Sequence, residues 1–555
     1  MLTRPADTPP CAAWAIGIAV IVAVLPLWLV PGVAAYFDWP LHLFWIQEFS
    51  RAVGQGTAYP RWIAAANGGY GAPTFVFYGP LAYWLAAAAT ACGASALTAL
   101  KLVYTTAVAV GAFAAWRWYR VFGGTAAAMP AAAAILSPPL LMLIYRYNLP
   151  AAALATALSP LVLLGAWSAR RGAGVAAIGV PFACVLLAHL PSALMLGVAL
   201  ALLALPDLAS AEGRRRIVTI AAGLGLGFAL AAFYWLPALW ELRYVHAEAL
   251  LGGALDWRRN LLFDPSIDSL HRARGDGLYL EATALTLAAA LAAAWVFVER
   301  SASATSSDRA AIRRLGVAAF VLLALATPLG TAFYRYVPGA AQLQFGWRWL
   351  PLFALVAGAA IALAVRHAGP ASRLAAVALA SLPPAAFALS LPLVCGGGIV
   401  LPPVARTTPA QIAWALEAPR LDPPEHVPRA APLGLMRNSG PAWTTLRGEA
   451  TVTLLEDRDE RRVWDVRAAD EATVRVKTLC FPGWAIEVDG AEVATSCDRI
   501  GALLFQLPAG DHRGVQAFRS TVDRLVATWI SLCALLALVV LVVMEARCPR
   551  LRHRE

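Results

Sequence analysis

The residues with the clearest chemical potential follow the first apolar stretch, where acidic, basic and aromatic side chains alternate with glycine and proline. Asp38 stands between Phe37 and Trp39, so we expect its carboxylate to be partly desolvated and therefore a better proton acceptor. Its hard oxygen ligands could hold a divalent cation instead. The alternative is that Asp38 only caps the helix that follows it.

The residues after Asp38 predict how that carboxylate is held. The apolar spacing from Leu41 to Val53 is typical of a helix, which places His42 within one turn of Asp38 and Glu48 farther along. His42 and Glu48 would then support the chemistry of Asp38, and His42 could share a cation with it. The alternative for His42 is a solvated neighbour without a role.

Arg61 lies farther along the same segment, between Pro60 and Trp62. A guanidinium group offers a rigid fork of donors, which suits an anion such as phosphate. The alternative is that Arg61 extends to the lipid headgroups, as arginines near membrane interfaces commonly do.

The elements that must position these residues are membrane helices. With 60% hydrophobic and only 14% charged residues, the chain is far more apolar than a soluble domain, in which about 25% of residues are charged. Stretches such as Ala12 to Val33, Ile217 to Trp240 and Leu525 to Met544 have the length of roughly 20 residues that crosses a bilayer. The first stretch could instead be a secretory signal, although signal cores are shorter, at ~7–15 residues.

The net charge of +11 comes from arginines in short connections between apolar segments, which is how membrane orientation is encoded, so no nucleic acid is expected as a partner. Placing these connections in the cytoplasm predicts about twelve crossings with both termini cytoplasmic. Because each crossing moves the chain to the other side of the membrane, only one crossing fits between the first outer loop and the arginines that follow Trp116. We therefore expect Leu97 to Tyr119 to cross and Leu81 to Cys92 to lie at the outer interface. A helix break is expected at His189 to Pro191.

The chain divides into a transmembrane core at residues 1–393 with a first outer loop at 34–79, an outer domain at 394–521, a last membrane helix at 522–546 and a basic cytoplasmic tail at 547–555. From about residue 447 the outer domain has alternating runs such as Ala472 to Lys477, separated by turn signals such as Asp489-Gly490. We expect a small β-sandwich-like domain. Cys480 and Cys497 flank one hairpin, where either a disulfide or two buried thiols fits.

An ordered set of short motifs runs through nearly the whole chain. Its members are Asp38 to His42, Tyr59 to Trp62, Gly69 to Pro73, Phe77 to Leu81, Ser137-Pro138, Tyr145-Arg146, His189, Phe233 to Pro237, Gln344 to Trp349, Phe481 to Trp484, Val488 to Gly490 and Pro508 to His512. This set resembles the bacterial membrane proteins called 6-pyruvoyl-tetrahydropterin synthase-related, whose label does not describe their chemistry. These are similar to the GT-C superfamily of polytopic glycosyltransferases and to the YfhO-like family.

The resemblance implies a GT-C-like membrane-embedded fold with an outward-facing cavity. An acidic residue of the first outer loop then activates the acceptor or binds a metal, and Asp38 is the matching position. The resemblance also implies a sugar donor on a polyprenyl phosphate, whose phosphate is received by basic residues at outer helix ends; Arg61, Arg146 and Arg348 are the matching positions. The alternative for Arg146 and Arg348 is that they anchor helix ends in the membrane.

One departure from the family concerns a second acidic group. Relatives often carry a glutamate where this chain has Ala151, so a second carboxylate would have to come from Glu241, Asp256 or Glu281. His189 could line the same cavity, or it could be a hydrogen-bonded structural residue at the helix break.

The predicted function is that of a glycosyltransferase in a bacterial inner membrane. It would move a sugar from a lipid-linked donor to an envelope glycan, lipid or protein acceptor on the outer face, with or without a divalent cation. Two alternatives are a catalytically silent envelope scaffold and a lipid or glycan transporter. A transporter usually has related halves and paired charges in mid-membrane, which the sequence does not display.

Overall fold

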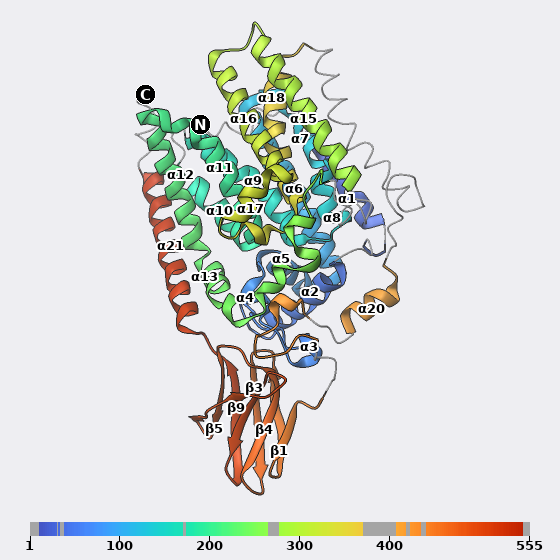
Figure 1. Cartoon of the computed structure of the whole chain (residues 1–555), viewed down its shortest axis with the longest axis vertical. Helices are drawn as coiled ribbons and strands as arrows, with labels where there is room; N and C mark the ends of the chain where they lie inside the picture. Colours follow the sequence, from blue (N-terminus) through green and yellow to red (C-terminus); the bar gives the residue numbers. More distant parts are fainter. Residues whose placement is uncertain are drawn as a thin grey trace.

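A helical part and a β-rich part lie at opposite ends of the long axis of the molecule (Figure 1). The computed structural model describes residues 10–29, 31–33, 38–169, 174–264, 277–369, 407–417, 422–434 and 440–547. The expected boundary at residues 393 and 394 and the expected tail beyond residue 547 lie outside the described residues.

Long apolar helices make up the larger part. Six of those described are long and apolar enough to cross a membrane, or up to eight if each of two bent pairs counts as one span. The six are Ala96–Tyr145, Pro150–Ser168, Leu190–Ala209, Tyr279–Arg300, Gly346–His367 and Val522–Met544, and the bent pairs are Ala211–Leu230 with Ala232–Tyr244 and Ser306–Leu325 with Pro328–Tyr336. The predicted polytopic helical architecture is confirmed, whereas about twelve crossings and two cytoplasmic termini stay predictions.

The individual helices are α1 Pro10–Leu29, α2 Trp39–Gly54, α3 Ala66–Gly69, α4 Thr74–Phe77, α5 Leu81–Ala91, α6 Ala96–Gly123, α7 Ala128–Ile135, α8 Pro138–Tyr145, α9 Pro150–Ser168, α10 Ala176–Ala188, α11 Leu190–Ala204, α12 Ala211–Leu230, α13 Ala232–Trp240, α15 Gly277–Arg300, α16 Ser306–Leu325, α17 Thr331–Tyr336, α18 Leu350–His367, α20 Pro409–Glu417 and α21 Val522–Arg547. Short 3-10 turns join several of them, including η5 Glu241–Tyr244, η8 Trp257–Arg259 and η11 Gly346–Trp349.

Two features of the helical part follow the sequence closely. Helix α5 has 11 residues, which span about 16 Å and cannot cross about 30 Å of hydrocarbon. Helices α10 and α11 are separated at His189, whose backbone is extended, and Pro191 sits in the first turn of α11, where a missing N–H costs little. The His189 ring accepts a hydrogen bond from the Ser192 backbone N–H at 3.3 Å and so caps α11.

The β-rich part is a sandwich of two sheets, as the sequence predicts. Its strands are β1 Trp443–Arg447, β2 Ala450–Arg458, β3 Arg461–Ala468, β4 Ala472–Leu479, β5 Trp484–Val488, β6 Ala491–Glu492, β7 Ser496–Cys497, β8 Ala502–Leu507 and β9 Gly510–Phe518. The sheet orders are β1-β4-β8-β7 and β2-β3-β9-β5-β6. Positive φ at Asp489 and Gly490 provides the tight turn between β5 and β6. Cys480 and Cys497 form a disulfide.

The sandwich rests on the first outer loop. Trp62 and Tyr70 of the loop belong to the same buried apolar cluster as the inner faces of the strands, and the backbone N–H of Leu479 donates to the Tyr70 carbonyl at 2.8 Å. Gly71 has φ +82°, and a Cβ there would lie 2.2 Å from the Trp62 indole nitrogen. This glycine therefore allows the loop to fold tightly under Trp62.

Candidate functional site

Asp38 lies at the N-cap position of α2, on the outer-loop side of the helical part. Its side chain is exposed and makes no capping hydrogen bond to the helix, so the simple capping alternative does not describe it. The backbone carbonyl of Asp38 instead accepts from the His42 N–H at 3.0 Å, which begins the helix. The predicted helix over Leu41 to Val53 is confirmed, and it extends slightly at both ends.

His42 is buried, not solvated, with 1% of its surface exposed. Its Nδ1 pairs with the Tyr83 hydroxyl at 2.7 Å, while its Nε2 is buried with no hydrogen-bond partner in the described structure. Burial lowers the pKa of His42 to about 3, so the ring is neutral at physiological pH. One ring nitrogen is thus available to a ligand or a water molecule.

Tyr78 is the residue on which the charges of this region converge. Burial, and after it the negative charge of Asp38, raise the pKa of the Tyr78 phenol above its usual range, whereas the positive charge of Arg348 opposes that rise. The Tyr78 ring lies 4.8 Å from that of Trp45 and 5.8 Å from that of His42. The charges of Asp38 and Arg348, which are far apart in the chain, therefore act on the same phenol.

Arg348 reaches this region from η11, at the start of the helical span that continues as α18. One guanidinium nitrogen donates to the Leu343 carbonyl at 2.8 Å and to the Gln344 side-chain oxygen at 3.1 Å. No carboxylate in the described part of the chain lies within ion-pair distance of Arg348, and Asp38 is the acidic side chain that acts on it at longer range. The guanidinium keeps capacity for a further anion.

His189 lies in the same region, because the charge of Arg348 and the ring of His42 both act on it. Since its Nδ1 accepts the Ser192 backbone N–H, the proton of the neutral ring is assigned to Nε2. His189 therefore caps the broken helix, as the structural alternative expects, and its lining of a catalytic cavity stays a prediction.

Glu48 and Arg61 lie elsewhere. Glu48 forms an ion pair of 2.6 Å with Arg51, at the end of α2 that faces the sandwich. Arg61 stacks over the Tyr59 ring at 4.4 Å, and its backbone N–H donates to a Glu460 oxygen at 2.8 Å. Glu48 is thus connected through Arg51 to Asp459, in the turn between β2 and β3. The Arg61 guanidinium also donates to the Phe233 carbonyl of α13 at 3.4 Å, and no described contact joins either residue to Tyr78.

Arg146 is 3% exposed at the C-terminal end of α8 and is not among the charges that act on Tyr78 in the described structure. Its role in binding phosphate stays a prediction.

The three proposed sources of a second carboxylate have other partners. Glu241 pairs with Arg524 at 2.7 Å, Asp256 pairs with Arg258 at 3.2 Å, and Glu281 accepts the Phe263 backbone N–H at 2.7 Å.

Sequence reasoning missed Asp422 and His426, which lie in the segment 422–434 between α20 and the sandwich. Asp422 is 4% exposed and accepts hydrogen bonds from Trp45 at 3.0 Å and from Thr74 at 2.6 Å. His426 lies one helical turn along, at 3.2 Å from Asp422. The available signal was an acid and a histidine four residues apart in Asp422-Pro-Pro-Glu-His426.

A metal ion finds little support at this site. No group of three or more His, Cys, Asp or Glu side chains that could hold one occurs among the described residues. His42 already uses Nδ1 for Tyr83, so Asp38 and His42 provide a carboxylate and one nitrogen at most. That donor set falls short of the six or more oxygens that hard cations prefer, and no catalytic step is derived through a metal.

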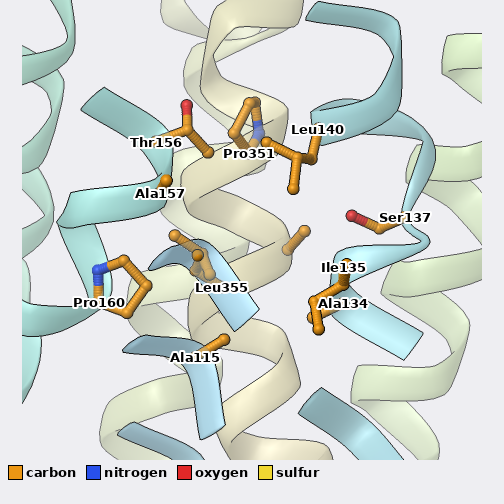
Figure 2. A pocket seen from close by; sticks show the side chains of 12 residues that line it. Ala115, Ala134, Ile135, Ser137, Leu140, Thr156, Ala157, Pro160, Pro351 and Leu355 are labelled. Carbon is orange, nitrogen blue, oxygen red and sulfur yellow. The ribbon is translucent and has the colours of Figure 1, made fainter. Parts of the chain in front are cut away.

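A separate cavity lies within the helix bundle, among α6, α7, α8, α9 and α18 (Figure 2). Ser137 and Thr156 carry the polar side chains in its lining, and the other lining residues are apolar. None of the predicted site residues lines it, so this cavity and the surroundings of Tyr78 are different places.

The model of a family described as a 6-pyruvoyl-tetrahydropterin synthase related domain, membrane protein, matches residues 75–387. No protein of curated function matches the chain.

Solved structures that are similar to this chain at low identity include two of ArnT and one of AftD. ArnT from Cupriavidus metallidurans in the apo state shows 14% identity over 70% of this chain and 65% of its own, with a TM-score of 0.44. The arabinofuranosyltransferase AftD from Mycobacteria shows 17% identity over 70% of this chain and 27% of its own, with a TM-score of 0.41. ArnT from Cupriavidus metallidurans bound to undecaprenyl phosphate shows 14% identity over 75% of this chain and 89% of its own, with a TM-score of 0.32.

Proposed function

Because the chain belongs to the 6-pyruvoyl-tetrahydropterin synthase-related family of membrane proteins, we propose that it is a membrane glycosyltransferase of the GT-C type. It moves a sugar from a polyprenyl-phosphate-linked donor to an envelope glycan, lipid or protein on the outer face of a bacterial inner membrane. The observation that carries this proposal is that the charges of Asp38 and Arg348 both act on the buried Tyr78 phenol. A proton acceptor and a cation without an ion pair are the two groups that such a transfer needs.

Asp38 acts as the base in this proposal. Its carboxylate takes the proton of the acceptor hydroxyl while the acceptor oxygen forms a bond to the anomeric carbon of the sugar. The bond between that carbon and the phosphate oxygen breaks, and its electron pair leaves with the phosphate. Asp38 is exposed at the N-cap of α2, so its side chain lies at the surface of the described structure, where an acceptor can approach it.

Arg348 receives the leaving phosphate, whose negative charge grows as the bond breaks. A guanidinium fixed by Leu343 and Gln344 stabilises that charge without reorganising, which lowers the barrier. The neutral His42 and the Nε2–H of His189 provide hydrogen-bonding groups beside it. Arg61 is proposed to hold the loop in place, since its backbone N–H donates to Glu460 of the sandwich and its guanidinium donates to the Phe233 carbonyl of α13.

The test is transfer by the purified full-length protein in liposomes, supplied with a panel of polyprenyl-phosphate sugars and followed by mass spectrometry. Asp38→Asn keeps the shape of the side chain and is expected to lower transfer at least 100-fold while membrane insertion and the melting temperature stay unchanged. Asp256→Asn, which removes a carboxylate paired with Arg258 in the turn η8, is the matched control and is expected to keep the wild-type rate. Full transfer by Asp38→Asn would contradict the assignment of Asp38 as the base.

A further inference from the structure

The segment 422–434 closes over the first outer loop through one buried carboxylate. Asp422 accepts from the Trp45 indole, the Thr74 hydroxyl and the His426 ring, and its backbone N–H donates to the Asn67 side chain at 3.0 Å. Hydrogen bonds from three donors hold this carboxylate in one orientation. Segment 422–434 is thereby fixed against α2 and α4.

His426 is oriented by this carboxylate. Its Nδ1 lies 3.2 Å from Asp422 Oδ2, so Nδ1 carries a proton and Nε2 is the nitrogen with no hydrogen-bond partner in the described structure. Burial disfavours the charged ring, yet the hydrogen bond and charge of Asp422 outweigh burial and raise the pKa of His426 above its ordinary value. The ring is therefore cationic over a wider pH range than a free histidine.

The surroundings of His426 are those of the site already described. The ring stacks on Phe77 at 6.1 Å and lies 5.8 Å from Trp45 and 6.5 Å from Tyr78. Tyr78 is the phenol on which Asp38 and Arg348 act. The same aromatic cluster contains His42, whose buried Nε2 has no hydrogen-bond partner in the described structure and could bond to a ligand.

We propose that His426, positioned by Asp422, is a second cationic contact, in addition to Arg348, for a phosphate group bound beside Tyr78. Its Nε2–H donates a hydrogen bond to a phosphate oxygen, and no covalent bond changes. The identity of the ligand as a phosphate rests on the proposed function. The outer segment 422–434 would thus supply part of the binding site, in addition to the membrane helices.

The groups that face His426 determine its pH response. They are Asp422 and Glu425 on its own segment and Tyr78 from the first outer loop, while Trp45 and Phe77 are uncharged. Both carboxylates favour the imidazolium, and the phenol stays neutral at physiological pH. Binding of an anion is expected to weaken as pH rises through the raised pKa of His426.

The experiment measures binding by the full-length protein in detergent between pH 5.5 and 9, on the order of the range over which a histidine titrates. The probes are farnesyl methyl phosphodiester, whose single charge does not change over this range, and inorganic phosphate. Wild type is expected to bind the diester about tenfold more tightly at the acid end, as one charge-assisted hydrogen bond is gained. His426→Gln is expected to bind about tenfold more weakly at the acid end and to lose the pH dependence.

His246→Gln is the matched control, because His246 also pairs with a carboxylate and also holds segment 422–434, through the Ala431 carbonyl at 3.0 Å. It is expected to keep wild-type affinity. Asp422→Asn is expected to move the midpoint of the pH dependence to lower pH. Equal losses in His426→Gln and His246→Gln, or wild-type affinity in His426→Gln, would overturn the proposal.

Two further results separate this inference from the proposed function. Binding of inorganic phosphate with the same dependence on His426 would identify a site for free phosphate and not for a lipid headgroup. If wild type binds the diester through His426 but transfers no sugar, the proposed function fails while the binding site stands. If transfer occurs and His426→Gln changes neither binding nor rate, the inference alone fails.

Discussion

Arg51 of α2 and Asp459 of the turn between β2 and β3 form an ion pair of 2.6 Å that joins the first outer loop to the sandwich. Arg51 also pairs with Glu48 at 2.6 Å, so two carboxylates share one guanidinium. Asp459 is 3% exposed, and burial raises its pKa to about 6 despite the charge of Arg51. The junction between the loop and the sandwich is thereby sensitive to pH.

The first prediction concerns this junction. A carboxyl whose folded pKa is raised holds its proton more tightly in the folded protein, so it stabilises the fold at low pH and that contribution is lost as pH rises from about 4 through about 6. The change amounts to about 2–3 kcal/mol. Thermal unfolding of Asp459→Asn should have a flatter pH dependence than wild type between these values. Parallel curves for the two proteins would contradict it.

The second prediction separates two arginines that the sequence treats alike. Arg348→Gln removes the cation proposed to receive the leaving phosphate and should lower sugar transfer about 100-fold or more. Arg61→Gln loses the contact over Tyr59, worth about 0.5–1 kcal/mol, and the hydrogen bond to the Phe233 carbonyl, while its backbone bond to Glu460 remains. It should therefore keep most of the transfer rate and melt slightly earlier. The opposite ranking of rates would place the phosphate beside Arg61.

The third prediction concerns the buried ion pair of Glu241 and Arg524, in which both side chains are 1% exposed. Glu241→Gln leaves a buried guanidinium without its counter-charge, which should cost about 3–5 kcal/mol in unfolding free energy. The double variant Glu241→Leu with Arg524→Met should recover most of that loss, because it removes both charges. Denaturation in detergent provides the measurement, and a double variant as unstable as the single one would refute this account.

The fourth prediction concerns the disulfide between Cys480 and Cys497, which are separated by 17 residues. A loop of that length gains about 3 kcal/mol from the cross-link. Replacing both cysteines with alanine should increase protease cleavage within the sandwich while the membrane helices stay protected. Cys533→Ala, which removes an exposed free thiol of α21, is the control and should cleave like wild type.

Local patterns predict much of this structure. The apolar spacing after Asp38 predicts α2, the His189-to-Pro191 sequence predicts the break between α10 and α11, and alternating polarity predicts β4. In each case the sequence pattern and the element that it predicts lie within one short segment. Periodicity and the backbone chemistry of proline are therefore enough to predict the element.

The partners of the site residues could not be predicted in this way. Arg61 meets Glu460 at a separation of 399 residues, and Trp45 meets Asp422 at a separation of 377. Such contacts depend on how the sandwich and segment 422–434 fold back over the loop, which no local pattern encodes. The same limitation explains why Asp422 and His426 were missed, and why Glu48 and Arg61 were placed with Asp38.

The two ends of helix α2 belong to different parts of the structure, the candidate site and the contact with the sandwich. Its first turn presents Asp38 and His42, and its last turns hold Glu48 and Arg51 against the sandwich, about 15–20 Å away along a rigid axis. Insertion or deletion of a single residue within α2 would rotate one end against the other by about 100°. Natural variants of this family should therefore tolerate substitutions on α2 far better than insertions or deletions, so the number of residues in α2 should stay constant.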